Sequence, residues 1–127
     1  MSIQFDPSRG LVVVMARLFG PMGQRAIRLA VDTGATMTTV RTATLVRLGY
    51  DPAGSGQRVS MTTASGVEYV PRVPVDRMDV LGQKRLIFPV VAHTLPPSTT
   101  VDGLLGLDFF RGIRVTIDFV EGRITLA

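Results

Sequence analysis

Apolar residues in this chain fall in short runs, many rich in valine, isoleucine and leucine, which glycine, proline and small polar residues interrupt. Such runs between turn residues predict β-strands rather than helices. Leu11–Phe19 and Arg25–Val31 flank the turn cluster Gly20-Pro21-Met22-Gly23, which predicts a β-hairpin. A further strand is expected at Met37–Val40. The pattern as a whole is typical of an all-β barrel or sandwich.

The rest of the chain continues this alternation of strands and turns. Three more hairpins are predicted, with the strand pairs Gln57–Ala64 and Val67–Val75, Asp79–Val80 and Arg85–Val91, and Ile113–Phe119 and Arg123–Leu126. A loop is expected at Pro96–Thr100. Thr42–Leu48 is the one segment with apolar residues at helical spacing, and Gly49 supplies a stop signal after it. One short helix is therefore expected there.

Composition is typical of a compact folded domain, because 46% of the residues are hydrophobic and 19% are charged. No apolar run approaches the ~20 residues that a membrane-spanning helix requires. The early run Leu11–Ala16 is too short for the apolar core of a signal peptide. We therefore expect a single domain over residues 1–127, with no membrane partner and a cytoplasmic location.

The chain is basic, with a net charge of +4, but its arginines are scattered and only Lys84 and Arg85 are adjacent. With two tyrosines and no tryptophan, a stacking surface for nucleic acid is poorly supported, so a nucleic-acid-binding barrel ranks as the last hypothesis. The chain has no cysteine and His93 is its one histidine, so a metal site of the usual kind is not expected. No phosphate-binding or dinucleotide motif indicates a cofactor.

The candidate chemistry lies at Asp32-Thr33-Gly34, directly after the apolar strand that ends at Val31. A turn at the end of a buried strand can present one carboxylate. On its own the tripeptide is a weak signal, since a turn or capping aspartate would then be the better explanation. A second segment strengthens it: residues 101–110 place an aspartate, a glycine, two leucines and another glycine ahead of Leu107-Asp108-Phe109-Phe110.

In this order and spacing, the two segments resemble one lobe of the aspartic proteases. The resemblance is to the retropepsin-like class, meaning the retroviral proteases and their single-lobe bacterial and eukaryotic relatives, and it covers nearly the whole chain. It implies a small closed β-barrel of the acid-protease type with one or two short helices. Retroviral enzymes usually have an acidic residue at the position of Thr36 and an arginine at that of Leu107. Their joint absence places this chain with the cellular and bacterial branch.

The resemblance also implies how catalysis would be assembled. Aspartic-protease hydrolysis needs two carboxylates that share one proton, and this chain has a single Asp-Thr-Gly and no internal repeat. We therefore expect a homodimer in which Asp32 of each subunit activates a water toward a peptide or protein substrate. Thr33 would bond across the dimer axis, and Gly34 would let substrate approach closely. The strand Arg123–Ala127 is the candidate for pairing between subunits.

Further roles follow from the same resemblance. The hairpin that turns at Ser65-Gly66 corresponds to the flap that closes over substrate. Sequence alone would favour an ordinary surface hairpin, and only the position between the two signature segments supports the flap. Residues expected to contact the peptide are Ala35, Thr36, Ala64, Ser65, Gly66 and Val67. Residues expected to pack behind the Asp32 turn are Leu104, Leu105 and Gly106, followed by a short helix at Leu107–Phe110. Asp108 is interpreted as structural.

One competing hypothesis uses the same fold without chemistry. A catalytically silent retropepsin-like module would bind peptides or proteins in the same cleft. The intact Asp32-Thr33-Gly34 argues against it. Two carboxylates on a dimer axis repel each other unless they share a proton, so a pure binding module would gain nothing from keeping them.

Overall fold

The computed structural model describes residues 1–96 and 98–127, with the backbone alone at Thr63, so Pro97 in the predicted loop Pro96–Thr100 lies outside the described residues. The elements along the chain are β1 (Ser2–Gln4), β2 (Val13–Gly20), β3 (Gly23–Val31), β4 (Thr39–Arg41), α1 (Thr42–Arg47), η1 (a 3₁₀-helix, Pro52–Gly54), β5 (Arg58–Thr63), β6 (Gly66–Val80), β7 (Gln83–His93), β8 (Gly103–Leu105), β9 (Val115–Asp118) and β10 (Arg123–Leu126).

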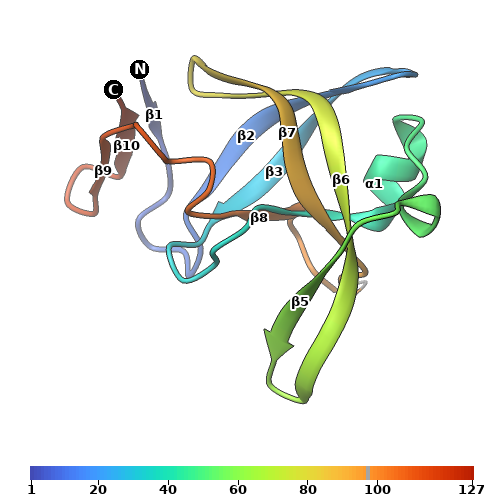
Figure 1. Cartoon of the computed structure of the whole chain (residues 1–127). Coiled ribbons are helices and arrows are strands. Elements are labelled where there is room, and N and C mark those ends of the chain that lie inside the picture. Colours follow the sequence, from blue (N-terminus) through green and yellow to red (C-terminus); the bar gives the residue numbers. More distant parts are fainter. Residues whose placement is uncertain (97) are drawn as a thin grey trace.

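Six strands close into a barrel in the order β2, β3, β8, β4, β7 and β6, and pairing between β2 and β6 completes the circle (Figure 1). The β3–β8 and β4–β7 pairs are parallel, and the other pairs are antiparallel. Closure pairs the edges that an open sheet would leave exposed. The predicted closed β-barrel is confirmed.

The barrel interior is filled by the apolar side of each strand. In β2, Val14, Ala16 and Leu18 are buried, whereas Met15 and Arg17 between them are exposed. This alternation follows from the two-residue period of a strand. Strands from distant parts of the sequence supply the rest of the core, which includes Ile27, Leu29, Val40, Leu45, Val75, Met78, Val90, Leu105, Phe109 and Ile124.

The local signals of the sequence correspond closely to these elements. β2 and β3 form the predicted hairpin, with Gly20 opposite Gly23 at its turn. The helix α1 lies where it was expected, and Gly49 after it has a φ of +93° that favours glycine. Next to it, the Tyr50 hydroxyl donates to the Phe19 carbonyl and accepts from the Asp76 N–H, both at 2.8 Å. Burial raises the pKa of this phenol, and its two bonds tie the end of the helix to β2 and β6.

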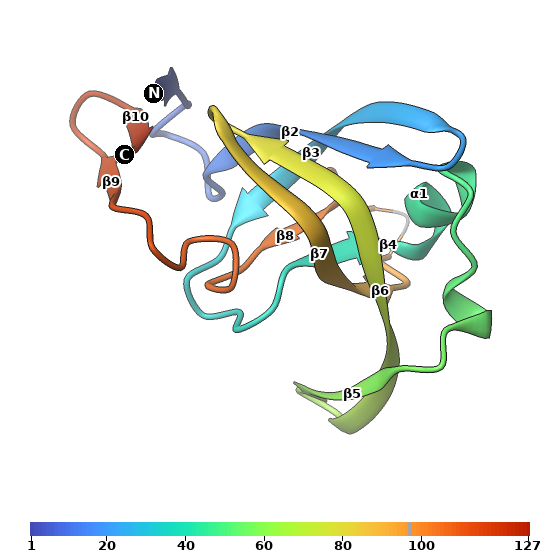
Figure 2. The same ribbon diagram turned by 45° about the horizontal axis from the view of Figure 1, so that its top comes forward.

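The hairpin of β5 and the first part of β6 extends away from the barrel (Figure 2). Pairing between β6 and β7 reaches Arg72 opposite Val91. Before Arg72, β6 pairs with β5, from Arg58 opposite Pro71 to Thr63 opposite Gly66. We call residues 58–71 the flap hairpin. Its shape agrees with the hairpin expected at Gln57–Ala64 and Val67–Val75, with β6 continuing further into the barrel.

Both ends of the chain meet in a separate three-stranded sheet, in the order β1, β10 and β9. The Met1 amino group donates to the Leu126 carbonyl at 2.9 Å, and the termini lie side by side in Figure 1. Both sides of β10 are thus occupied by strands of its own chain. The expectation that Arg123–Ala127 pairs with another subunit is therefore wrong for this arrangement, because its backbone groups are already used. The pairing with β1 was not predicted.

The short helix expected at Leu107–Phe110 is replaced by consecutive tight turns. Phe109 and Phe110 each donate to the carbonyl three residues earlier, at 3.2 and 3.0 Å, and Gly112 has a φ of +76°. At this turn the carboxylate of Asp108 accepts hydrogen bonds from the N–H and the hydroxyl of Thr38. Among the described residues, no helix is long and apolar enough to cross a membrane.

Candidate active site

The two signature segments lie side by side in the barrel. β3 and β8 pair in parallel, with Leu29 opposite Gly103 and Val31 opposite Leu105. Asp32, at the end of β3, donates its N–H to the Leu105 carbonyl at 3.0 Å. A side chain at Gly103 would collide with the carbonyl oxygen of Thr39 on β4, so this strand crossing needs glycine. The residues that suggested a shared site in the sequence are therefore neighbours in space.

The turn after β3 fixes the position of the Asp32 side chain. Its Oδ1 accepts the N–H of Gly34 at 2.9 Å, and its main-chain carbonyl accepts the N–H of Ala35 at 3.1 Å. A Cβ at Gly34 would lie 3.2 Å from Oδ1, which is tight. The carboxylate is half-buried, so it is oriented by the backbone and remains accessible. Thr33 on the same turn is exposed.

The second signature segment, residues 101–110, packs against this turn. Leu107 donates its N–H to the Ala35 carbonyl at 2.9 Å. Gly106 is buried, and a Cβ there would lie 2.7 Å from the carbonyl carbon of Met37 and 2.9 Å from the Ala35 oxygen. Only glycine lets the two backbones approach this closely. The supporting positions expected for Leu105 and Gly106 agree with these contacts.

A buried threonine joins the two segments more firmly than the sequence suggested. The Thr38 side chain is fully buried; its hydroxyl donates to Asp108 Oδ1 at 2.7 Å and accepts the Gly106 N–H at 3.1 Å. The Thr38 N–H also bonds the Asp108 carboxylate, and Phe109 donates its N–H to Oδ1. Asp108 thus has the structural role assigned to it. The sequence prediction missed Thr38, because nothing in the local sequence distinguishes it from Thr39.

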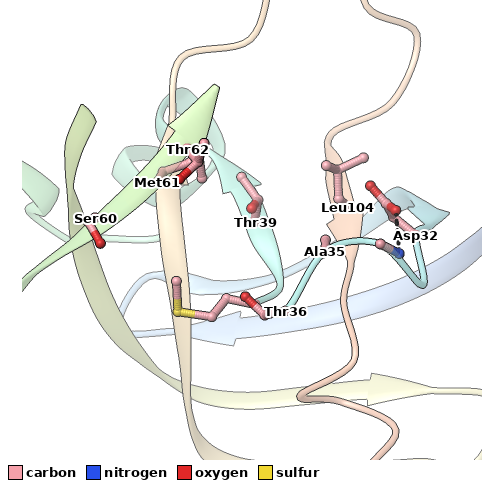
Figure 3. Close-up of a pocket in the computed structure, with 10 residues that line it drawn as sticks. Asp32, Ala35, Thr36, Thr39, Ser60, Met61, Thr62 and Leu104 are labelled. Carbon is pink, nitrogen blue, oxygen red and sulfur yellow. Dashed lines mark hydrogen bonds between the residues drawn. The ribbon is translucent and has the colours of Figure 1, made fainter. Parts of the chain in front are cut away.

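A pocket of about 420 Å³ opens in front of the Asp32 carboxylate (Figure 3). One wall comes from the Asp32 turn and from Leu104 of β8, and the other comes from strand β5 of the flap hairpin (Figure 3). The lining residues are Asp32, Gly34, Ala35, Thr36, Met37, Thr39, Ser60, Met61, Thr62 and Leu104. Apolar and hydroxyl-bearing side chains alternate around one carboxylate, which suits an extended peptide that needs both side-chain contacts and hydrogen bonds.

The structure brings together most, but not all, of the predicted site residues. Asp32, Gly34, Ala35 and Thr36 line the pocket together with Leu104, whereas Thr33 lies beside it and Leu105 and Gly106 are buried behind it. The four residues of the hairpin tip are exposed and do not line the pocket; they are Ala64, Ser65, Gly66 and Val67. Their contact with substrate stays a prediction.

Three flap residues were missed by the sequence prediction. Ser60, Met61 and Thr62 on β5 line the pocket, a few residues before the predicted tip. The hairpin itself was predictable, but how far it leans over the pocket depends on the bend of β6 where it leaves the barrel. The sequence prediction did not indicate which part of the hairpin lies over the pocket.

The chemistry available in a single chain is limited. Asp32 is the one acidic residue among those that line the pocket. The described residues contain no group of three or more histidine, aspartate or glutamate side chains placed to hold a metal ion. The arrangement therefore offers one positioned carboxylate in a peptide-sized cleft, and a second carboxylate would have to come from another molecule.

Comparison with known proteins agrees with this geometry. The sequence model of the family described as "Aspartyl protease" matches residues 14–109. The crystal structure of a retropepsin-like aspartic protease from Rickettsia conorii matches with a TM-score of 0.73, covering 99% of this chain and 88% of the other at 19% sequence identity. No curated protein matches the sequence significantly. The retropepsin-like fold expected from the two signature segments is confirmed.

Proposed function

The chain belongs to the aspartyl protease family, and from that premise we propose that it is an aspartic endopeptidase that acts as a homodimer on peptide or protein substrates. Asp32 of each subunit would supply one half of a catalytic pair. The observation that carries this proposal is the position of the Asp32 carboxylate, which is held by the Gly34 N–H at the floor of a pocket roofed by the flap hairpin.

The proposed reaction proceeds without a covalent intermediate. The ionised carboxylate of the pair removes a proton from a bound water as its oxygen attacks the peptide carbonyl carbon. The protonated carboxyl of the other subunit gives its proton to the carbonyl oxygen, which forms a diol. The carboxyl that took the water proton then gives a proton to the peptide nitrogen, while the other carboxylate removes a proton from a diol hydroxyl. The carbon–nitrogen bond breaks, and the pair again holds one proton. The chemistry requires the pair to hold one proton, so activity is expected to peak at acidic to mildly acidic pH.

The surroundings of Asp32 support the assembly of such a pair. Thr33 is exposed on the same turn, so a second subunit can meet it there. The turn is backed by the bonds of Asp32 to Leu105 and of Leu107 to Ala35, which keep the carboxylate in place without a partner. Apolar walls from Met37, Met61 and Leu104 favour substrates with apolar side chains next to the cleaved bond.

One observation favours the alternative of a silent peptide-binding module. A single chain has a cleft of suitable size, but Asp32 is the one acid among its lining residues. If the protein stayed monomeric, it would bind extended peptides without cleaving them. The two functions are separated by oligomeric state and by the need for the Asp32 carboxylate.

The decisive experiment is cleavage of an unstructured peptide library between pH 3.5 and 7.5, with sedimentation at the assay concentration to establish the oligomeric state. We expect Asp32→Asn to reduce cleavage by about 10²–10⁴-fold, the usual contribution of acid–base catalysis. Asp76→Asn, on the exposed outer face of the barrel, is the matched control and should cleave like the wild type.

The outcomes separate the two functions. Cuts that are lost in Asp32→Asn and retained in Asp76→Asn would support the endopeptidase. Wild-type protein that is dimeric and binds the peptides, but cleaves none of them over the whole pH range, would contradict it and favour the silent module.

A further inference from the structure

A side-chain contact joins the flap hairpin to the barrel at the end of β7. Nε2 of His93, at the end of β7, lies 3.4 Å from Oε2 of Glu68 on β6. The His93 side chain is 26% exposed and that of Glu68 is 55% exposed. Glu68 lies four residues before Arg72, the first residue of β6 that pairs with β7, in the part that pairs with β5. The contact therefore crosses from the fixed barrel to the projecting flap hairpin.

The place of Glu68 in the hairpin connects this contact to the active-site pocket. Glu68 is opposite Met61 in the β5–β6 register. Met61 lines the pocket in front of Asp32. A force that holds Glu68 toward the barrel consequently fixes where Met61 and its neighbours sit above the cleft.

The contact borders a second cavity of about 460 Å³. Its walls come from α1, η1, β5, β6 and the end of β7. Besides His93 and Glu68, the charged and titratable groups that line this cavity are Arg58 on β5 and Tyr69 on β6. The lining residues from α1 and η1 are uncharged; they are Thr42, Pro52 and Ala53. Arg41 pairs with His93 in the β4–β7 register, but its guanidinium donates to the carbonyls of Leu95, Thr99 and Val101. The cavity leaves space next to the flap hairpin on the side of this contact.

We propose that His93 is a positioning residue of the flap and that its contact with Glu68 is a latch whose strength depends on pH. This inference goes beyond the peptidase chemistry. It rests on the proposed function, because holding the flap hairpin over the cleft matters only if substrate binds there. The ion pair exists while His93 carries a proton and Glu68 does not. Loss of the His93 proton or protonation of Glu68 removes one of the two charges and weakens the contact.

The test measures amide hydrogen exchange in the flap hairpin, residues 58–71, and needs no peptidase activity. Intrinsic exchange rates change with pH, so each variant is compared with the wild type at the same pH. In His93→Gln and in Glu68→Gln, we expect flap amides to exchange about two- to fivefold faster than in the wild type at pH 5.5, the range of a partly exposed ion pair. At pH 8.5 the ratio should be near one, because a neutral imidazole leaves little charge attraction to lose.

Glu121→Gln is the matched control. Glu121 is the other glutamate of the chain and is exposed in the turn between β9 and β10, away from the flap hairpin. It should leave flap exchange unchanged at both pH values. The same His93→Gln ratio at pH 5.5 and 8.5 would overturn the proposal in favour of a simple packing contact, and a ratio of one at both would overturn it entirely. A peptidase assay of the same samples shows separately whether the proposed function fails.

Discussion

The Asp32 turn and the flap hairpin face each other across one pocket, but they are held in different ways. The turn is backed by the buried Thr38 hydroxyl, by Gly106 and by main-chain bonds to β8. The flap hairpin is mostly exposed, with Val70 buried near its base. Sites that open locally at low cost have few buried contacts and exposed backbone bonds.

This difference matches the two tasks of a hydrolase cleft. A carboxylate that transfers protons has to be held to a fraction of an ångström, which requires a rigid support. A roof that admits and releases an extended chain has to move. Chemically equivalent substitutions should therefore lower the free energy of unfolding strongly in the segments that support Asp32 and only slightly in or beside the flap hairpin.

The largest expected effect comes from adding one methyl group under the turn. In Gly106→Ala, the new Cβ would lie 2.7–2.9 Å from main-chain atoms of Met37 and Ala35, which cannot rotate away. We expect a loss of about 3 kcal/mol in the free energy of unfolding, the upper end for overpacking, measured by urea denaturation. Gly56→Ala, just before the flap hairpin, meets nothing within 4 Å and is the control. Equal losses in both variants would contradict the contrast.

The second effect comes from removing one hydroxyl. Thr38→Val keeps the shape of the side chain but removes the bond to Asp108 and leaves the buried Gly106 N–H without its acceptor. We expect a loss of about 2–3 kcal/mol in the free energy of unfolding. Thr62→Val, on the exposed side of β5, should change it by less than about 0.5 kcal/mol. If Thr38→Val were as stable as the wild type, the junction between the two segments would not depend on this hydroxyl.

The same contrast explains what could be predicted from the sequence. The β2–β3 hairpin, α1 and the β9–β10 hairpin were predicted because their signals are local: apolar runs next to turn residues, and a glycine after a short helix. Asp32 was predicted because its tripeptide and the segment around Gly103 and Gly106 resemble a known family. These are the parts in which neighbouring residues in the sequence determine the structure.

The parts that were missed depend on contacts between distant residues. β1 pairs with β10 across almost the whole chain, and that pairing occupies the edge expected to meet another subunit. Thr38 gains its role from Asp108, seventy residues away. At the tight turns of Leu107–Phe110, where a helix was expected, the Asp108 carboxylate is bonded to Thr38. Local pattern cannot report such contacts, since each needs the fold to be known first.

The smallest expected effect on stability, but one that reports on function, is in the flap wall of the pocket. Met61→Ala shortens a half-buried side chain that lines the pocket, so we expect KM for an apolar peptide to rise about fivefold while the free energy of unfolding changes by less than about 1 kcal/mol. Val67→Ala at the exposed tip is the comparison. A larger KM in Met61→Ala alone would mean that substrate is bound with the flap hairpin positioned as in this structure. Equal increases in both variants would mean that the hairpin closes further and brings the tip onto the peptide, as the sequence predicted.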